Sequence, residues 1–437
     1  MRSFIITLLG AAILVPLPGN CDTVELELQC DRPWVEAGKE QTVLVKIAAR
    51  GRELPVADRA PVNLSLVIDK SGSMSGDRIV NARKGAIEAI RRLGRDDIFS
   101  VVVYDSRVET LIPAGRLTDI ERVERIINGI TAAGTTNIHG GLEAGFAELE
   151  KNFDRRHLNR MVLLSDGLAN VGPTRPEAFA ELGRTFSGKG VVISTVGLGL
   201  DYNERLMADL ARAGEGNNYF VHDAGSLPKI FREEIGHLVG TVARGVIIRI
   251  EIPDGVEVER VLGRGHRREG RMVEIDFHDL AAGHRKYSLL ELRVPGGADG
   301  EVLPPFRATA SYRRATDDVM GQVEGQAEVR YTASARQVER TVRPEVRDAW
   351  AELRQADLQE EVLDLVAQGR REDARGALRR VSDEAAGLGW SAMPPALEKY
   401  RLGEEEILMD RDFSPEEVRS RRAESYQLRT QQATGRE

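Results

Sequence analysis

The chain has no excess of basic residues, few aromatic residues and no long hydrophobic run beyond its first 20 residues. Its 437 residues include 61 Lys and Arg against 69 Asp and Glu, and the net charge of −8 argues against a nucleic-acid-binding protein. The one basic stretch, residues 264–271, is typical of a solvated hairpin tip. Aromatic residues make up 5% of the chain, which predicts cores filled by aliphatic side chains. A chain of this length and composition predicts two or three globular domains and no transmembrane helix.

Cysteine is nearly absent, and both cysteines lie close to the amino terminus. Residues 1–20 predict a signal peptide, because Arg2 supplies positive charge and residues 4–17 form an apolar stretch too short to span a membrane comfortably. We therefore expect export, to the periplasm or the cell surface if the source is a bacterium. Two alternatives stay open for Cys21 and Cys30: a disulfide between them, or a lipidated Cys21 that would attach the chain to a membrane.

The most informative stretch is residues 69–76, Asp-Lys-Ser-Gly-Ser-Met-Ser-Gly. It follows an apolar run, residues 62–68, that predicts a buried strand, and it precedes a predicted helix. Asp69, Ser71 and Ser73 therefore lie at alternate positions on a tight loop at the carboxyl end of a strand. Oxygen ligands on such a loop are what a hard divalent cation requires.

Two further residues extend this set to a site. Thr136 lies in Gly-Thr-Thr-Asn-Ile, and Asp166 follows another apolar run and precedes Gly167. In this order, the residues resemble the metal-ion-dependent adhesion site of von Willebrand factor type A domains, whose pattern is Asp-x-Ser-x-Ser, then a Thr, then an Asp before Gly. The resemblance implies a metal site made by Asp69, Ser71, Ser73, Thr136 and Asp166.

The resemblance also implies what such a site does. With few anionic ligands, a Mg²⁺ (or Mn²⁺ or Ca²⁺) ion keeps a position open for an Asp or Glu of a partner protein. The domain is then a binding module and not an enzyme, and its protein partner is unknown. We expect the rim touched by the partner to include Met74, Asn137, His139 and Gly167.

The pattern of apolar residues predicts three kinds of structure along the chain. Strand-like runs at 63–68, 99–104, 161–164, 191–197 and 218–221 alternate with helical segments, which predicts a doubly wound parallel α/β sheet. Short alternating runs on both sides of this region predict an antiparallel β-sandwich into which the α/β domain is inserted. The predicted segments are a signal peptide at 1–20, sandwich strands at 22–60, the type A domain at 61–240, the rest of the sandwich at 241–335, a helical tail at 336–425 and a disordered end at 426–437.

The resemblance continues past the metal loops. Residues 197–204 and 211–220 look like the end of the type A domain in bacterial exported proteins related to inter-α-trypsin inhibitor heavy chains, in which β-rich segments flank the domain on both sides. One departure follows Gly167, where Leu168, Ala169 and Asn170 stand in a stretch that commonly holds an acidic residue.

Two other functions are compatible with parts of the pattern. Residues 68–73 resemble the aspartyl-phosphate motif of haloacid-dehalogenase-like phosphatases, which are Mg²⁺-dependent enzymes, but Asn170 stands where their second acidic residue belongs. Type A domains also resemble metal-binding subunits of ATP-driven chelatases and chaperones. The predicted signal peptide argues against this cytoplasmic role.

Overall fold

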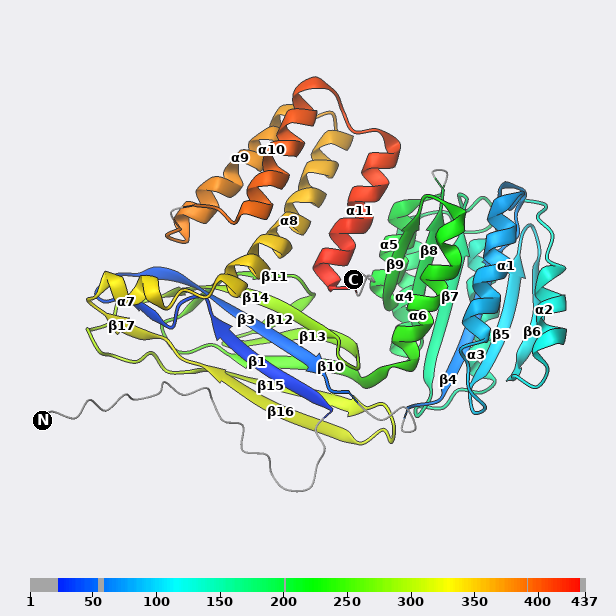
Figure 1. The fold of residues 1–437 in the computed structure, drawn as a ribbon, viewed down its shortest axis with the longest axis horizontal. Helices are drawn as coiled ribbons and strands as arrows, with labels where there is room; N and C mark the ends of the chain where they lie inside the picture. Colours follow the sequence, from blue (N-terminus) through cyan, green and yellow to red (C-terminus); the bar gives the residue numbers. More distant parts are fainter. Residues whose placement is uncertain (1–22, 54–58, 200–201, 391, 433–437) are drawn as a thin grey trace, which may run out of the picture.

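The computed structural model describes residues 23–53, 59–199, 202–390 and 392–432. An α/β domain lies at one end of the molecule and a β-sandwich at the other, and a helical tail packs over the sandwich and reaches the α/β domain (Figure 1). This arrangement confirms the predicted fold class. The predicted signal peptide and Cys21 lie outside the described residues.

The α/β domain is built on a six-stranded sheet in the order β6-β5-β4-β7-β8-β9. Its strands are β4 Val62–Asp69, β5 Ile98–Tyr104, β6 Val108–Arg116, β7 Leu158–Ser165, β8 Val192–Leu198 and β9 Glu215–Val221. Every residue of β4 and β7 is buried, because helices cover both faces of the sheet. The chain runs from β4 to β5 on one side and returns to β7 on the other side of β4, so the carboxyl end of β4 lies at the topological switch point.

Helices pack on both faces of this sheet. They are α1 Asp77–Ile90, α2 Ile120–Asn128, α3 Ile138–Glu150, α4 Pro176–Gly188, α5 Glu204–Ala213 and α6 Leu227–Val239. Helices α1, α2 and α6 share one hydrophobic core with the sheet, and α3, α4 and α5 share the other. The sheet is parallel, as predicted, except at one edge, where β6 pairs with β5 in an antiparallel manner. This strand has one neighbour and no buried residue, so it lacks the apolar run of a central strand.

The sandwich brings together strands from both sides of the α/β domain. One sheet has the order β1-β3-β14-β11, and the other has the order β12-β13-β10-β15-β16. Strand β3, which precedes the α/β domain, pairs with β14, which follows it, from Gln41 opposite Val294 to Arg50 opposite Arg285. The predicted insertion is therefore confirmed. The strands are β1 Val24–Cys30, β3 Gln41–Gly51, β10 Thr241–Glu251, β11 Glu257–Leu262, β12 His266–Glu269, β13 Met272–Ala281, β14 Arg285–Val294, β15 Phe306–Arg314 and β16 Met320–Ala327.

Two smaller features complete the sandwich. Strands β2 Trp34–Glu36 and β17 Arg330–Thr332 form a separate parallel pair. Residues 266–271 of the basic stretch lie in the hairpin of β12 and β13, as expected, and β12 is exposed over its whole length. The expectation was wrong for Arg264, which is buried and donates to the Thr430 carbonyl.

Cys30 is buried and has no disulfide partner among the described residues, and burial is the main cause that raises the pKa of its thiol to about 12. Its predicted disulfide and the lipidation of Cys21 stay predictions.

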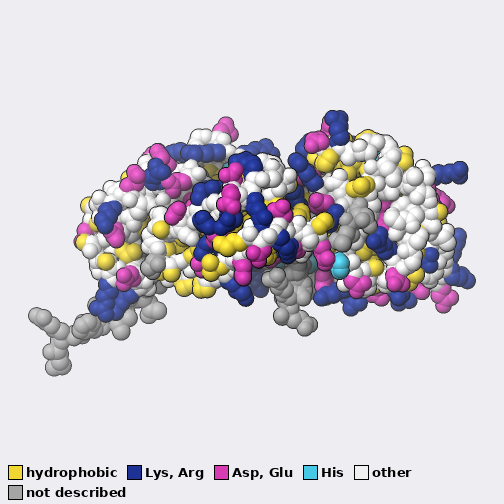
Figure 2. Space-filling view, turned by 90° about the horizontal axis from the view of Figure 1, so that it is seen from above, with side chains coloured by type: hydrophobic (Ala, Val, Ile, Leu, Met, Phe, Trp, Pro, Cys, Tyr) yellow, Lys and Arg dark blue, Asp and Glu magenta, His cyan; other side chains and the backbone are white. Residues whose placement is uncertain are grey.

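The helical tail comprises α7 Ala335–Arg340, α8 Pro344–Ala367, α9 Arg371–Gly387, α10 Pro395–Asp410 and α11 Pro415–Thr430. Trp350 of α8 is fully buried in a core that also contains Leu44 and Leu289 of the sandwich, which fixes the tail to the outer face of that sheet. Arg and Lys side chains are interspersed with Asp and Glu over the tail (Figure 2), as in the ion pair of Arg354 with Glu384. No helix of the described ranges is long and apolar enough to span a membrane.

The expectation of disorder from residue 426 was wrong as far as residue 432. Helix α11 continues to Thr430, and Tyr426 and Gln432 are buried. These residues are ordered by contacts with the α/β domain, where the Tyr426 hydroxyl donates to the Gly216 carbonyl (2.7 Å) and the Asn218 N–H donates to Gln432 Oε1 (3.2 Å). Polar composition therefore did not exclude a docked helix end.

Candidate metal centre

Three loops meet at the carboxyl edge of the α/β sheet. The first follows β4 and contains a 3-10 turn, Gly72–Met74; the second, residues 133–137, precedes α3; the third, residues 166–171, follows β7. Backbone hydrogen bonds tie the loops together, from the Gly72 N–H to the Gly134 carbonyl (3.0 Å) and from the Asn170 N–H to the Thr136 carbonyl (3.1 Å). Of the five residues predicted as metal ligands, four lie on these loops and Asp69 is the last residue of β4, where the first loop starts.

Asp69 ends β4 and its side chain is fully buried. Its Oδ1 accepts a hydrogen bond from the Ser71 N–H (2.8 Å), and its Oδ2 accepts one from the Ser165 hydroxyl (2.7 Å). Burial raises the pKa of Asp69 to about 6, because loss of solvation outweighs these hydrogen bonds and the charge of Asp166 adds to it. A cation beside Asp69 would therefore stabilise the charged form of this buried carboxylate.

The two serine hydroxyls connect Asp69 to the carboxylate on the other side of the site. Ser71 Oγ lies 3.0 Å from Ser73 Oγ, and Ser73 Oγ donates to Asp166 Oδ1 at 2.6 Å. Adjacent ligands of an octahedral ion with bonds of 2.0–2.1 Å are about 3 Å apart. The serine pair therefore already has the spacing of two neighbouring ligands of Mg²⁺.

Thr136 approaches the same point from the second loop. A Cβ atom at Gly167 would lie 3.4 Å from Thr136 Oγ1 and 3.5 Å from Ser73 Oγ, so this glycine lies directly beside both hydroxyls. The Thr136 N–H donates to Asn170 Oδ1 at 2.7 Å. Asn170 belongs to the stretch in which the family commonly has an acidic residue. In this chain it positions the Thr136 loop.

Asp166 is fully buried, and its negative charge is balanced by an arginine that was not predicted from the sequence. Arg78, near the start of α1, donates from Nη1 to Asp166 Oδ2 at 2.6 Å. The sequence signal for this pair was weak, since Arg78 lies outside the motif. A second missed residue is Ser165, whose apolar neighbours in β7 conceal its hydroxyl contact with Asp69.

The predicted rim is partly wrong. Met74 is fully buried in the core beneath α1, and Gly167 is also buried, so neither offers a side chain to a partner. Asn137 accepts a hydrogen bond from the Gly140 N–H (3.0 Å) and caps α3, and His139 Nδ1 lies 3.2 Å from Glu143 Oε2; both are half-buried. Leu168, 57% exposed beside Asp166, is an apolar rim residue that the sequence prediction missed.

Asp105 follows β5 at the same edge of the sheet but belongs to a separate turn. Its Oδ1 accepts from the Arg107 N–H (2.7 Å), and its Oδ2 pairs with Lys70 Nζ (2.5 Å). Among the described residues, no group of three or more His, Cys, Asp and Glu side chains could hold a metal ion. The oxygen set at this edge instead combines two carboxylates with three hydroxyls, which suits a hard cation and not a soft one.

A family model for the von Willebrand factor type A domain matches residues 63–233, which span the sheet and all three loops. Protein YfbK of Escherichia coli (strain K12) is 28% identical over 272 residues, which make up 60% of this chain and 46% of YfbK. Inter-alpha-trypsin inhibitor heavy chain H3 of Pongo abelii is 27% identical over 172 residues, 37% of this chain and 19% of the heavy chain. The match therefore spans less than half the length of either relative.

The likeness in three dimensions extends beyond this domain. A solved structure described as von Willebrand factor type A from Catenulispora acidiphila superimposes with a TM-score of 0.65 at 17% identity. The superposition covers 90% of this chain and 97% of that one, so the shared fold includes the sandwich and tail regions.

Proposed function

Because residues 63–233 form a von Willebrand factor type A domain, we propose that this chain binds a partner protein through a divalent cation at the carboxyl edge of the sheet. Domains of this family often mediate metal-dependent binding between proteins. The observation that carries the proposal is the 3.0 Å separation of the Ser71 and Ser73 hydroxyls, placed between two buried carboxylates.

The ligand set defines what the ion can accept. Ser71, Ser73 and Thr136 contribute neutral oxygens, and only Asp69 and Asp166 contribute negative charge, part of which Arg78 already balances. A divalent cation held by these residues keeps net positive charge toward the solvent. An Asp or Glu side chain of the partner completes the set, and Leu168 adds an apolar contact beside it.

The same chemistry gives the choice of ion and the class of protein. Hydroxyl and carboxylate ligands favour Mg²⁺, Mn²⁺ or Ca²⁺ over softer metals. We propose a binding module and not an enzyme, and export to the periplasm or cell surface, since residues 1–20 have the pattern of a signal peptide. Fractionation of the source cells tests the location.

Metal binding is tested first by thermal unfolding of the full chain in EDTA and after addition of Mg²⁺, Mn²⁺, Ca²⁺ or Zn²⁺. A ligand at 100 times its Kd stabilises the folded state by about 2.7 kcal/mol. We expect this stabilisation in the wild type and in Asp105→Asn, a matched control from the same edge of the sheet. We expect its loss in Asp69→Ala and Thr136→Ala. Undiminished stabilisation of Asp69→Ala would overturn the proposed site.

Partner binding is tested next by a pull-down from envelope extract with and without chelator. A true partner is captured by the wild type in Mg²⁺, is released by EDTA and is not captured by Asp69→Ala. Capture that persists in EDTA contradicts binding through the ion, even if the metal itself binds as expected.

A further inference from the structure

A second polar site lies at the other end of β7, where the α/β domain meets the sandwich. A cavity of about 630 Å³ is bounded there by residues 153–160 and 187–192 of the α/β domain and by residues 244–249 and 311–320 of the sandwich. This volume is within the range of small-molecule pockets, which often lie between domains. Its lining has six Lys and Arg side chains against three Asp and Glu, although the whole chain has a net charge of −8.

Arg160 is the most buried cation of this lining. It projects from β7 with 7% of its surface exposed. Its guanidinium forms long ion pairs with Glu234 Oε1 (3.7 Å) and Asp279 Oδ2 (3.8 Å), and its Nη1 makes a long hydrogen bond to Ser194 Oγ (3.5 Å). Its Nε is buried without a partner among the described residues. A buried donor of this kind is satisfied by an ordered water or by a bound acceptor. Arginine Nε atoms elsewhere in the described chain also lack a partner, so it is Arg160 together with the positive charge of the lining that indicates an anion.

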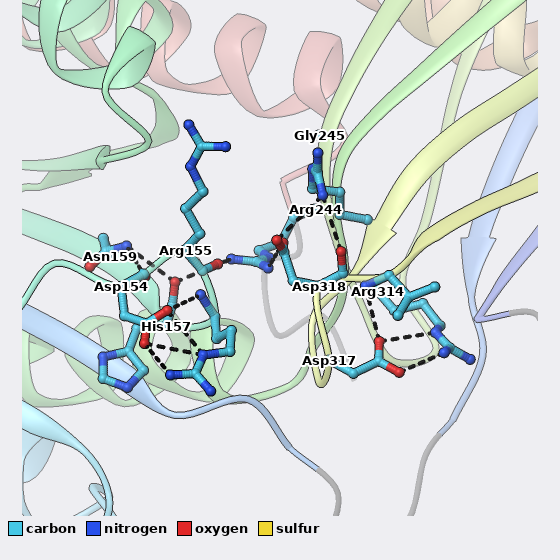
Figure 3. A network of polar contacts seen from close by, with 12 residues as sticks. Asp154, Arg155, His157, Asn159, Arg244, Gly245, Arg314, Asp317 and Asp318 are labelled. Atoms are coloured by element: carbon cyan, nitrogen blue, oxygen red, sulfur yellow. Dashed lines mark hydrogen bonds and ion pairs between the residues drawn. The ribbon is translucent and has the colours of Figure 1, made fainter.

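Arg244 joins the two walls of the cavity from the sandwich side. Its guanidinium donates to the backbone carbonyl oxygens of Arg155 and His157 and, at 2.6 Å, to Asp318 Oδ1 (Figure 3). These contacts fix its position, yet its Nε is buried and has no partner within the described ranges. His157 also lines the cavity, and its Nδ1 is likewise buried without a hydrogen-bond partner among the described residues.

Arg155 adds an exposed cation to the lining. Its side chain is exposed and extends away from the network around Arg244 in Figure 3. In the part of the chain that the structure describes, its guanidinium makes no hydrogen bond and no ion pair. The neighbouring Arg156 differs, because it is paired with Asp154 at 2.6 Å and does not line the cavity.

The remaining wall is apolar. Phe153 is 39% exposed and Met320 is 55% exposed, and both line the cavity, one from each domain. Leu238 and Ile247 lie deeper in the lining. A ligand with charge alone would leave this surface in contact with water, whereas a ligand with an apolar part covers it.

We propose that this cavity binds a small organic anion, a carboxylate or phosphate group on an apolar body. The anionic group accepts hydrogen bonds from Arg155, Arg160 and Arg244, and the apolar body packs between Phe153 and Met320. Because both domains supply contacts, the bound anion also holds their relative orientation. The site is separate from the metal-binding edge and does not depend on the function proposed there.

The test is calorimetric titration of the full chain with phenyl phosphate, benzoate and phenol, all in EDTA so that a metal-bound anion does not contribute. We expect saturable binding of at least one of the two anions, and the stronger of them identifies the preferred group. Phenol, which has the apolar body without the charge, should not bind.

Arg155→Ala should weaken binding by about tenfold, as expected for loss of one charge-assisted hydrogen bond. Arg156→Ala, which removes an equal charge from the same loop, should leave it unchanged.

Three results would overturn the proposal. One is the absence of saturation with both anions, which would mean that water alone satisfies the buried donors. The second is equal weakening by Arg155→Ala and Arg156→Ala, which would indicate general attraction to a basic loop. The third is binding of phenol as tight as that of the anions, which would remove the role of charge.

Discussion

The two ends of β7 differ in the kind of atom they collect and in how well those atoms are paired. At the carboxyl end, carboxylate and hydroxyl oxygens converge, and Asp69 and Asp166 each accept hydrogen bonds on both oxygens. At the amino end, arginines converge, and the Nε atoms of Arg160 and Arg244 remain without partners in the described part of the molecule. Both ends bury charge, but only the first is already arranged around a common point.

The difference follows from how far apart in the chain the contributing residues lie. Ser71 and Ser73 share one tight loop with Asp69, so short-range backbone geometry sets the spacing of most ligands. The cavity instead requires Arg160 of one domain and Arg244 of another to meet across a junction. A local motif can thus preorganise a site, whereas a site at a domain interface depends on how the two domains meet.

The largest expected effect is at the amino end of β7. Arg160→Ala removes the cation next to Glu234, which is 1% exposed and whose other contacts are hydrogen bonds from neutral groups such as Ser194 and Tyr219. Because this change leaves a buried carboxylate without its cation, we expect the free energy of unfolding to fall by about 3–5 kcal/mol. Urea unfolding measures the loss, with the exposed Arg155→Ala as a control that should change stability by less than about 0.5 kcal/mol. A loss under about 1 kcal/mol would mean that neutral hydrogen bonds are enough to hold the buried carboxylate.

The second largest expected effect is the pH dependence of stability that arises from Asp69, at the carboxyl edge of the sheet. The pKa of Asp69 is raised to about 6 in the folded state, and an unfolded aspartate titrates near 3.9, so the folded protein binds more protons between these values. In EDTA, stability should therefore fall as the pH rises from about 4 to about 6, by at most about 3 kcal/mol. Above pH 6 the full penalty is present, and an added divalent cation should remove it.

Asp69→Asn isolates this contribution, because other titrating groups cancel when the variant and the wild type are compared by urea unfolding at each pH. The variant should become the more stable of the two as the pH rises. A difference that does not vary between pH 4 and pH 7 would show that hydrogen bonds from Ser71 and Ser165 fully compensate the burial of the charge.

The smallest effect tests whether the carboxyl end depends on contacts outside the motif. Asn170→Ala leaves the Thr136 N–H without its acceptor, which should lower stability by about 1 kcal/mol and weaken the affinity for Mg²⁺. Asn170→Asp keeps an acceptor oxygen at the same place and should restore both. If Asn170→Ala binds Mg²⁺ as the wild type does, the Thr136 loop is held by its backbone contacts alone.

The elements that could be predicted from the sequence share a physical cause. Strands β4 and β7 are buried on both faces and are therefore mostly apolar, whereas the edge strand β6 is half-exposed and was not predicted. Met74 was expected on the rim, but it lies in a 3-10 turn and is buried in the core. The end of α11 was taken as disordered because its order depends on β9, a partner more than two hundred residues away.

The sequence by itself determined the fold class, and its resemblance to type A domains identified the oxygen-bearing residues of the candidate site, which meet because strand-end loops of a parallel sheet lie at one edge. Only the tertiary structure decided how the buried charges are balanced, through Arg78 and Ser165, and that a basic cavity exists at the domain junction. Those features arise from contacts between segments remote in the chain, and hydrophobic periodicity and local motifs carry no record of such contacts.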